Sequence, residues 1–151
     1  MPKKINKLFK TVVKSCQAIK AENIAALDLD AIESYADYII IVSGNSDRQL
    51  SAIADRVVED AYKKCKQHPL GVEGVGNSAW VLIDFGDVVC HVFLNEVRQH
   101  YRLEDMWPQV RPMGEQDLEK LFARKVLPAV VPEKKILRKG RVPKKSGLKV
   151  L

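Results

Sequence analysis

Two apolar runs separated by two residues constrain the fold of this chain more than any other feature. They span residues 80–85 and 88–94, and Gly86 and Asp87 lie between them. Glycine adopts the positive φ that a two-residue turn requires, so the sequence predicts a tight β-hairpin. A three-residue loop would change the cross-strand pairing but not the alternation of side chains within each strand.

This alternation divides the side chains of the hairpin between two faces. One face is wholly apolar and has to be covered: Val81, Ile83, Phe85, Val88, Cys90, Val92 and Leu94. The other face mixes large rings with a carboxylate and an imidazole: Trp80, Leu82, Asp84, Val89, His91 and Phe93. An all-apolar core has no use for that mixture, so the second face is where the sequence predicts function. Trp80 and Phe93 are either core beneath a helix or an exposed pair that anchors an interface, and the sequence leaves both open.

The segments before and after the hairpin predict a two-layer α/β domain over a mixed sheet. Apolar residues at helical spacing predict helices over residues 5–20 and, after a capping box at Ser46–Gln49, over residues 50–65. Strands are predicted at 24–29 and 38–42, and the second should be central because it is apolar on both faces. Residues 71–79 form a loop with at most one short strand, and Asn95 should cap a helix that starts near Glu96.

The chain changes character after residue 107. We expect three parts: a domain at 1–107, a proline-punctuated extension with one short helix at 108–131, and a basic, disordered tail at 132–151. Leu118, Leu121, Phe122 and Val126 suggest the helix of the extension. Residues 1–20 carry six Lys and no acid, residues 21–107 carry seven Lys or Arg against fifteen Asp or Glu, and residues 132–151 carry eight against one. The net charge of +6 therefore hides an acidic central domain between two basic ends. The charge of this central domain does not favour binding to nucleic acid.

The cysteine content and the hydropathy of the sequence restrict the class of protein to which this chain can belong. Cys16, Cys65 and Cys90 are odd in number and lack C-x-x-C spacing, which is typical of buried thiols in a reducing compartment such as the cytoplasm. No apolar run approaches the ~18 residues of a membrane span, and no signal peptide is apparent. We therefore expect a cytoplasmic protein without a membrane partner.

Known catalytic patterns fit the sequence poorly. Gly71, Gly74 and Gly76 are not followed by the Lys-Ser/Thr of a phosphate loop. A nucleotidyltransferase needs two carboxylates on one strand face for metal ions, whereas Asp84 and Asp87 flank a turn. No metal site or catalytic triad is predicted, and His91 is expected to bond to Asp84 or to a backbone group. An enzyme that acts on nucleotides or RNA ends with Mg²⁺ held by Glu73, Asp84 and Asp87 remains the alternative.

The motifs around the hairpin resemble those of the Iojap/YbeB family of ribosomal silencing factors (RsfS). They are L-G-V-E-G at 70–74, N-S-A-W at 77–80, D-F-G-D-V-V-C-H-V-F at 84–93 and Y-R-L-E-D-M-W at 101–107. Upstream, A-L-D-L at 26–29, Y-I-I-I-V-S-G-N-S at 38–46 and I-A-D-R-V-V at 53–58 also fit. The resemblance covers residues 5–107, and the extension after residue 107 departs from it.

The resemblance implies a nucleotidyltransferase-like fold without enzymatic activity or cofactor. It further implies binding to protein 14 of the large ribosomal subunit, which blocks subunit association and represses translation, or assistance in assembly of that subunit. Six residues match the docking surface of the family or its motif block: Glu73, Trp80, Leu82, Asp84, Asp87 and His91. For the tail we expect salt-sensitive contacts to ribosomal RNA through Lys134, Lys135, Arg138, Lys139, Arg141, Lys144 and Lys145. The sequence leaves open whether the protein is a homodimer.

Overall fold

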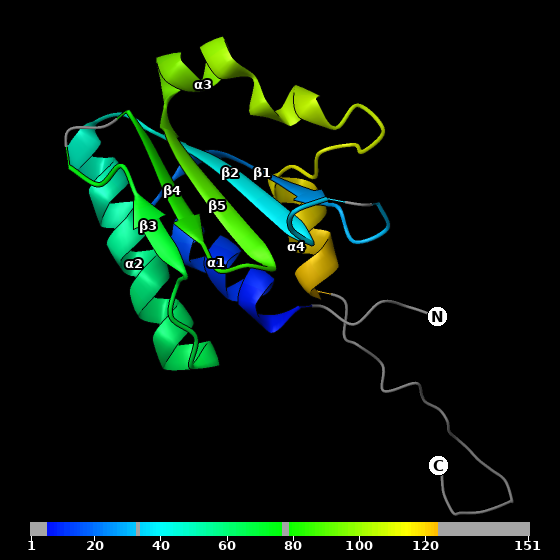
Figure 1. Cartoon of the computed structure of the whole chain (residues 1–151), viewed down its shortest axis with the longest axis horizontal. Coiled ribbons are helices and arrows are strands. Elements are labelled where there is room, and N and C mark those ends of the chain that lie inside the picture. Colours follow the sequence, from blue (N-terminus) through cyan, green and yellow to red (C-terminus); the bar gives the residue numbers. More distant parts are fainter. Residues whose placement is uncertain (1–5, 33, 77–78, 124–151) are drawn as a thin grey trace, which may run out of the picture. The chain divides into compact units, whose positions relative to one another are not determined.

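Five strands form one mixed sheet in the order β1-β2-β5-β4-β3 (Figure 1). The computed structural model describes residues 6–32, 34–76 and 79–123. The elements, in chain order, are α1 (Lys7–Ala18), β1 (Glu22–Asp28), β2 (Tyr38–Gly44), α2 (Asp47–Cys65), β3 (Gly71–Glu73), β4 (Trp80–Asp84), β5 (Val88–Leu94), α3 (Asn95–Tyr101), the 3-10 helix η1 (Leu103–Met106) and α4 (Glu115–Ala123). The predicted α/β class is confirmed, and the nucleotidyltransferase-like label stays a prediction.

The centre of the sheet is the parallel pair β2–β5, and every other neighbouring pair is antiparallel. All seven residues of β2 are buried, as the sequence predicts for a strand that is covered on both faces. The β2 strand runs two residues further than expected, to Gly44. The short strand that the sequence left open is β3, which pairs with β4 at the edge of the sheet.

The hairpin of β4 and β5 has the predicted two-residue loop. The amide of Phe85 donates to the carbonyl of Val88 at 2.9 Å, and Gly86 has a φ of +91°. This register pairs Trp80 with Phe93, Leu82 with His91 and Asp84 with Val89. The predicted division of side chains between two faces is therefore confirmed, because Trp80 and Leu82 are partly buried while Val81 and Ile83 are fully buried.

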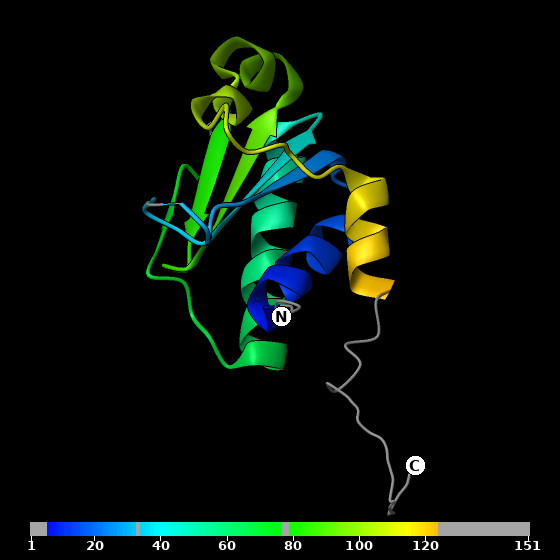
Figure 2. The same cartoon turned by 90° about the vertical axis from the view of Figure 1, so that its right-hand side faces the viewer.

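Helices α1 and α2 lie against the apolar face of the hairpin (Figures 1 and 2). At the start of α2, the Ser46 hydroxyl accepts from the amide of Gln49 at 3.1 Å, as predicted. The Gln49 side chain reaches back one residue further than in a standard capping box, to the amide of Asn45 at 2.7 Å. Cys16 and Cys90 are buried as expected, whereas Cys65, at the end of α2, is only half-buried.

The second face of the sheet is partly covered by α3 and η1, which follow β5 (Figure 2). The core on this side consists of Leu27, Leu29, Ala36, Ile39, Ile41, Val89, Phe93, Leu103 and Trp107. The predicted capping role of Asn95 is wrong, because the N-cap of α3 is Leu94 and makes no side-chain bond. Asn95 is already helical, and its side-chain amide nitrogen (Nδ2) donates to the side chains of Glu22 and Asn45 instead.

The chain continues in contact with the sheet after residue 107. The backbones of Met113 and Ala26 exchange two hydrogen bonds, of 2.8 and 2.9 Å, at the outer edge of β1. When residues are grouped by their mutual contacts, the chain divides into two units. One is Asn6–Glu119, and the other combines Met1–Ile5 with Lys120–Leu151. Val126 and the tail 132–151 lie outside the described residues, so the predicted three-part division stays a prediction. No helix of the described part is long and apolar enough to cross a membrane.

Candidate functional site: the aromatic surface around Trp80

Trp80 is the centre of an aromatic cluster on the second face of the sheet. Its ring centroid lies 4.7 Å from that of Phe93, 5.1 Å from that of Tyr101 and 5.8 Å from that of His91. Phe93 is fully buried, Trp80 is partly buried, and Tyr101 on α3 is 56% exposed. The pair is therefore not exposed as a whole, because Phe93 is core and Trp80 packs against the same core cluster while staying partly accessible.

Two open depressions flank the Trp80 side chain. The first, of about 320 Å³, is lined by Glu73, Gly74, Trp80 and Leu82. The second, of about 470 Å³, is lined by Ala79, Trp80, Glu96, Val97, His100 and Tyr101. Each depression combines apolar or aromatic surface with one carboxylate. We refer to Glu73, Trp80, Leu82, Glu96, His100 and Tyr101 as the Trp80 surface.

His91 lies beneath the Trp80 surface and forms a hydrogen bond with the indole of Trp80. The Trp80 Nε1–H donates to His91 Nδ1 at 3.1 Å, so the predicted bond of His91 to Asp84 or to the backbone is wrong. His91 is 5% exposed, and its Nε2 has no hydrogen-bond partner among the described residues. Burial lowers the pKa of His91 to about 4, although the negative charge of Asp84 opposes this shift. The imidazole is therefore neutral at neutral pH and can accept the bond from Trp80.

The predicted carboxylates lie on three separate segments, β3, β4 and the hairpin turn. Glu73 on β3 lies opposite Leu82, and Asp84 accepts the amide of Gly86 at 2.8 Å. Asp87 is exposed in the turn, and its carbonyl accepts the amides of Asp37 and Tyr38. Among residues 6–32, 34–76 and 79–123, no three His, Cys, Asp or Glu side chains are grouped to hold a metal ion. The alternative Mg²⁺ site is thus without support in this part of the chain.

The α3 residues of the Trp80 surface are absent from the sequence-based prediction. Tyr101 opens the motif Y-R-L-E-D-M-W, which would have been a signal, but nothing in the sequence places it against Trp80. The contact depends on the way α3 folds after the end of β5, next to Trp80 at the start of β4. The predicted tail residues, from Lys134 to Lys145, lie outside the described residues.

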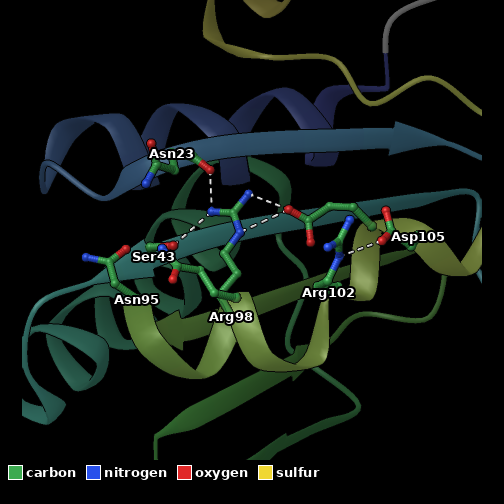
Figure 3. Close-up of a pocket in the computed structure, with 8 residues that line it drawn as sticks. Asn23, Ser43, Asn95, Arg98, Arg102 and Asp105 are labelled. Carbon is green, nitrogen blue, oxygen red and sulfur yellow. Dashed lines mark hydrogen bonds and ion pairs between the residues drawn. The ribbon is translucent and has the colours of Figure 1, made fainter.

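On the other side of α3, Arg98 binds groups of β1 and β2 (Figure 3). Its guanidinium donates twice to Glu104 of η1, at 2.9 and 3.1 Å. It also donates to the Ser43 hydroxyl on β2, at 2.9 Å, and to the carbonyl of Asn23. These residues line a polar pocket of about 320 Å³. At the mouth of that pocket, Arg102 pairs with Asp105 at 2.8 Å. The charged side chains around this pocket therefore bind one another.

Comparison with known proteins identifies the family. The family model described as "Ribosomal silencing factor during starvation" (RsfS) matches residues 2–140. The chain belongs to this family. Ribosomal silencing factor RsfS of Bacillus subtilis is 41% identical over 100 residues, which cover 66% of this chain and 84% of that protein. The mouse protein named "Mitochondrial assembly of ribosomal large subunit protein 1" is 37% identical over 90 residues, which cover 58% of this chain and 39% of that protein.

Solved structures of similar proteins have the same fold. A crystal structure of a Chromobacterium violaceum protein, 34% identical, matches with a TM-score of 0.65 and covers 70% of this chain and 88% of that one. A Bacillus halodurans structure, 37% identical, matches with a TM-score of 0.59 and covers 67% of this chain and 93% of that one. The fold of about two thirds of this chain therefore has experimental counterparts.

Proposed function

We propose that this chain is a ribosomal silencing factor that binds the large ribosomal subunit through the Trp80 surface. Its partner is protein 14 of that subunit, and the bound chain blocks joining of the small subunit and represses translation. A role in maturation of the large subunit is a second consequence of the same binding. The protein acts in the cytoplasm, where the ribosomes are.

The partly buried indole of Trp80, which lines two depressions, is the observation that carries this proposal. Interface hot spots are enriched in tryptophan and tyrosine, and they lie where surrounding groups exclude water. Trp80 and Tyr101 are residues of these two types, and their ring centroids lie 5.1 Å apart. Glu73 and Glu96, one in each depression, give the surface a negative charge that is complementary to a basic ribosomal protein.

Replacing Trp80 tests the proposal. A Trp80→Ala variant should lose about 10-fold or more of its affinity for purified large subunits, because the truncation removes the central anchor. Co-sedimentation measures this loss, and circular dichroism checks the fold. Tyr62→Ala is the matched control, since Tyr62 is a 47% exposed aromatic residue on α2, on the other side of the sheet. A folded Trp80→Ala variant that binds like the wild type would exclude the Trp80 surface as the docking site.

The basic tail supplies a second proposed contact. Residues 132–151 carry eight Lys or Arg against Glu133. Such a segment gains affinity for RNA by releasing the counterions of the phosphates. The proposed role of the tail is therefore to strengthen binding through ribosomal RNA, while the Trp80 surface selects the protein partner.

A further inference from the structure

The short helix α3 owes its position to contacts with other elements. It has seven residues, and its N-cap Leu94 offers no side-chain hydrogen bond. Helices of this length are not stable alone, so the place of α3 has to be set by contacts with the rest of the molecule. The Trp80 surface depends on that place, because three of its six residues (Glu96, His100 and Tyr101) belong to α3.

The two sides of α3 make contacts of different kinds. On one side Val97, His100 and Tyr101 border the depression next to Trp80, and these contacts are apolar and aromatic. Such contacts are weakly directional, so they define the position of a helix less tightly than hydrogen bonds do. On the other side, Asn95, Arg98 and Gln99 border the polar pocket of Figure 3. Here Arg98 makes directional bonds to three segments of the chain.

The Arg98 guanidinium is nearly buried and binds three different acceptor groups. Its side chain is 11% exposed, and it donates to Glu104, Ser43 and Asn23. These acceptors belong to η1, to β2 and to the irregular start of β1, where Asn23 has a φ of +51°. A planar guanidinium can satisfy three such acceptors in only one orientation, and an ammonium group cannot reproduce this fork. The cluster therefore fixes α3 in one position relative to the sheet.

We propose that Arg98 is a positioning residue of the Trp80 surface: by fixing α3 it sets Tyr101 against Trp80. Tyr101 is three residues after Arg98, less than one helical turn away. A shift of α3 would therefore move the Tyr101 ring away from the indole and change the shape of the larger depression. This inference rests on the proposed function for its consequence, the binding of the large subunit. The geometric part of the inference does not depend on it.

A double-mutant cycle between Arg98 and Tyr101 tests the proposal. Arg98→Lys keeps the charge and removes the fork, and Tyr101→Ala removes the ring that Arg98 is proposed to position. Each single variant should weaken binding to purified large subunits by about 5-fold or more. The double variant should lose clearly less than the product of the two single losses, because Arg98 acts mainly through a ring that is no longer present. Multiplied losses in the double variant would refute the proposal.

A stability-matched control separates positioning from general destabilisation. Val57→Ala truncates a fully buried residue of α2, on the other side of the sheet. Arg98→Lys should bind more weakly than Val57→Ala at equal loss of unfolding free energy, and equal binding would overturn the proposal. If Arg98→Lys folds poorly, Ser43→Ala, which removes one acceptor of the cluster, should give a smaller loss of the same kind. Two results together would also refute the positioning role. In the first, Ser43→Ala binds large subunits normally, and in the second, Arg98→Lys binds them no more weakly than Val57→Ala does.

The indole N–H signal of Trp80 in a nitrogen–proton NMR spectrum gives a readout that does not need the ribosome. Trp80→Phe assigns this signal. Arg98→Lys should move it in the same direction as Tyr101→Ala does, because both variants take away the nearby ring, and Val57→Ala should leave it in place. An unmoved signal would overturn the positioning role. If the wild-type chain fails to bind large subunits but the signal moves as expected, the proposed function is wrong and the positioning role of Arg98 stands.

Discussion

At the scale of single residues, the pairing of His91 with Trp80 joins a buried polar group to the candidate site. A neutral imidazole accepts the indole N–H at 3.1 Å and so fixes the orientation of the indole ring. Protonation would turn Nδ1 into a second donor and break this bond. The same group therefore links the stability of the fold and the state of the Trp80 surface to pH.

The stability of the protein should fall as the pH is lowered from about 7 to about 5. The pKa of His91 is lowered from 6.5 to about 4 in the folded chain, so in this range the unfolded chain binds the extra proton. The expected loss of unfolding free energy is about 2 kcal/mol. Urea unfolding at the two pH values measures it. His91→Gln keeps an acceptor but does not titrate, so the variant should lose much less, and an equal loss would assign the pH dependence to other groups.

At the scale of elements, a buried carboxylate joins α1 to α2. Asp60 on α2 is 8% exposed and accepts the Ser15 hydroxyl of α1 at 2.7 Å and the Arg56 side chain at 2.9 Å. Burial alone would raise the pKa of Asp60. The hydrogen bonds from Ser15 and Arg56, with the charges of Arg56 and Lys64, outweigh it and lower the pKa. The ionised carboxylate is thus the form that holds the two helices together.

Replacing Asp60 should destabilise the fold. Asp60→Ala leaves the buried Ser15 hydroxyl without this partner and removes a charge-assisted bond, which costs about 1–3 kcal/mol of unfolding free energy. Thermal or urea denaturation measures the change. Glu59→Gln is the adjacent control, because Glu59 pairs with Lys63 in an exposed i,i+4 pair that contributes little to stability. Similar losses for the two variants would show that the α1–α2 contact does not depend on Asp60.

The elements also show where sequence-based prediction reaches its limit. The hairpin, its two faces and the amphipathic α2 follow from patterns with periods of two and 3.6 residues, which are local properties of the chain. The α3 cluster is not local, because Arg98 binds groups 6, 55 and 75 residues away. Asn95 illustrates the same limit. It has a good capping side chain, but Glu22 and Asn45, distant in sequence, bind that side chain instead.

At the scale of the whole molecule, charges of opposite sign occupy different parts of the chain. Residues 21–107 carry fifteen Asp or Glu against seven Lys or Arg, whereas residues 132–151 carry eight against one. Under the proposed function, the acidic part would bind a basic ribosomal protein and the basic tail would bind ribosomal RNA. Salt should weaken both contacts, but the counterions released from RNA phosphates make the tail contact the more sensitive one.

The tail contact predicts a specific change in salt dependence. Deleting residues 132–151 should lower the affinity for large subunits about 10-fold or more at low salt. It should also reduce the slope of log affinity against log salt, while leaving the effect of Trp80→Ala unchanged. A variant with Gln at the seven proposed RNA-contacting positions of the tail keeps its length and should behave like the deletion. Binding assays at several salt concentrations measure both slopes. If the deletion leaves low-salt affinity and slope unchanged, the tail has no part in binding, and the acidic domain carries the whole interaction.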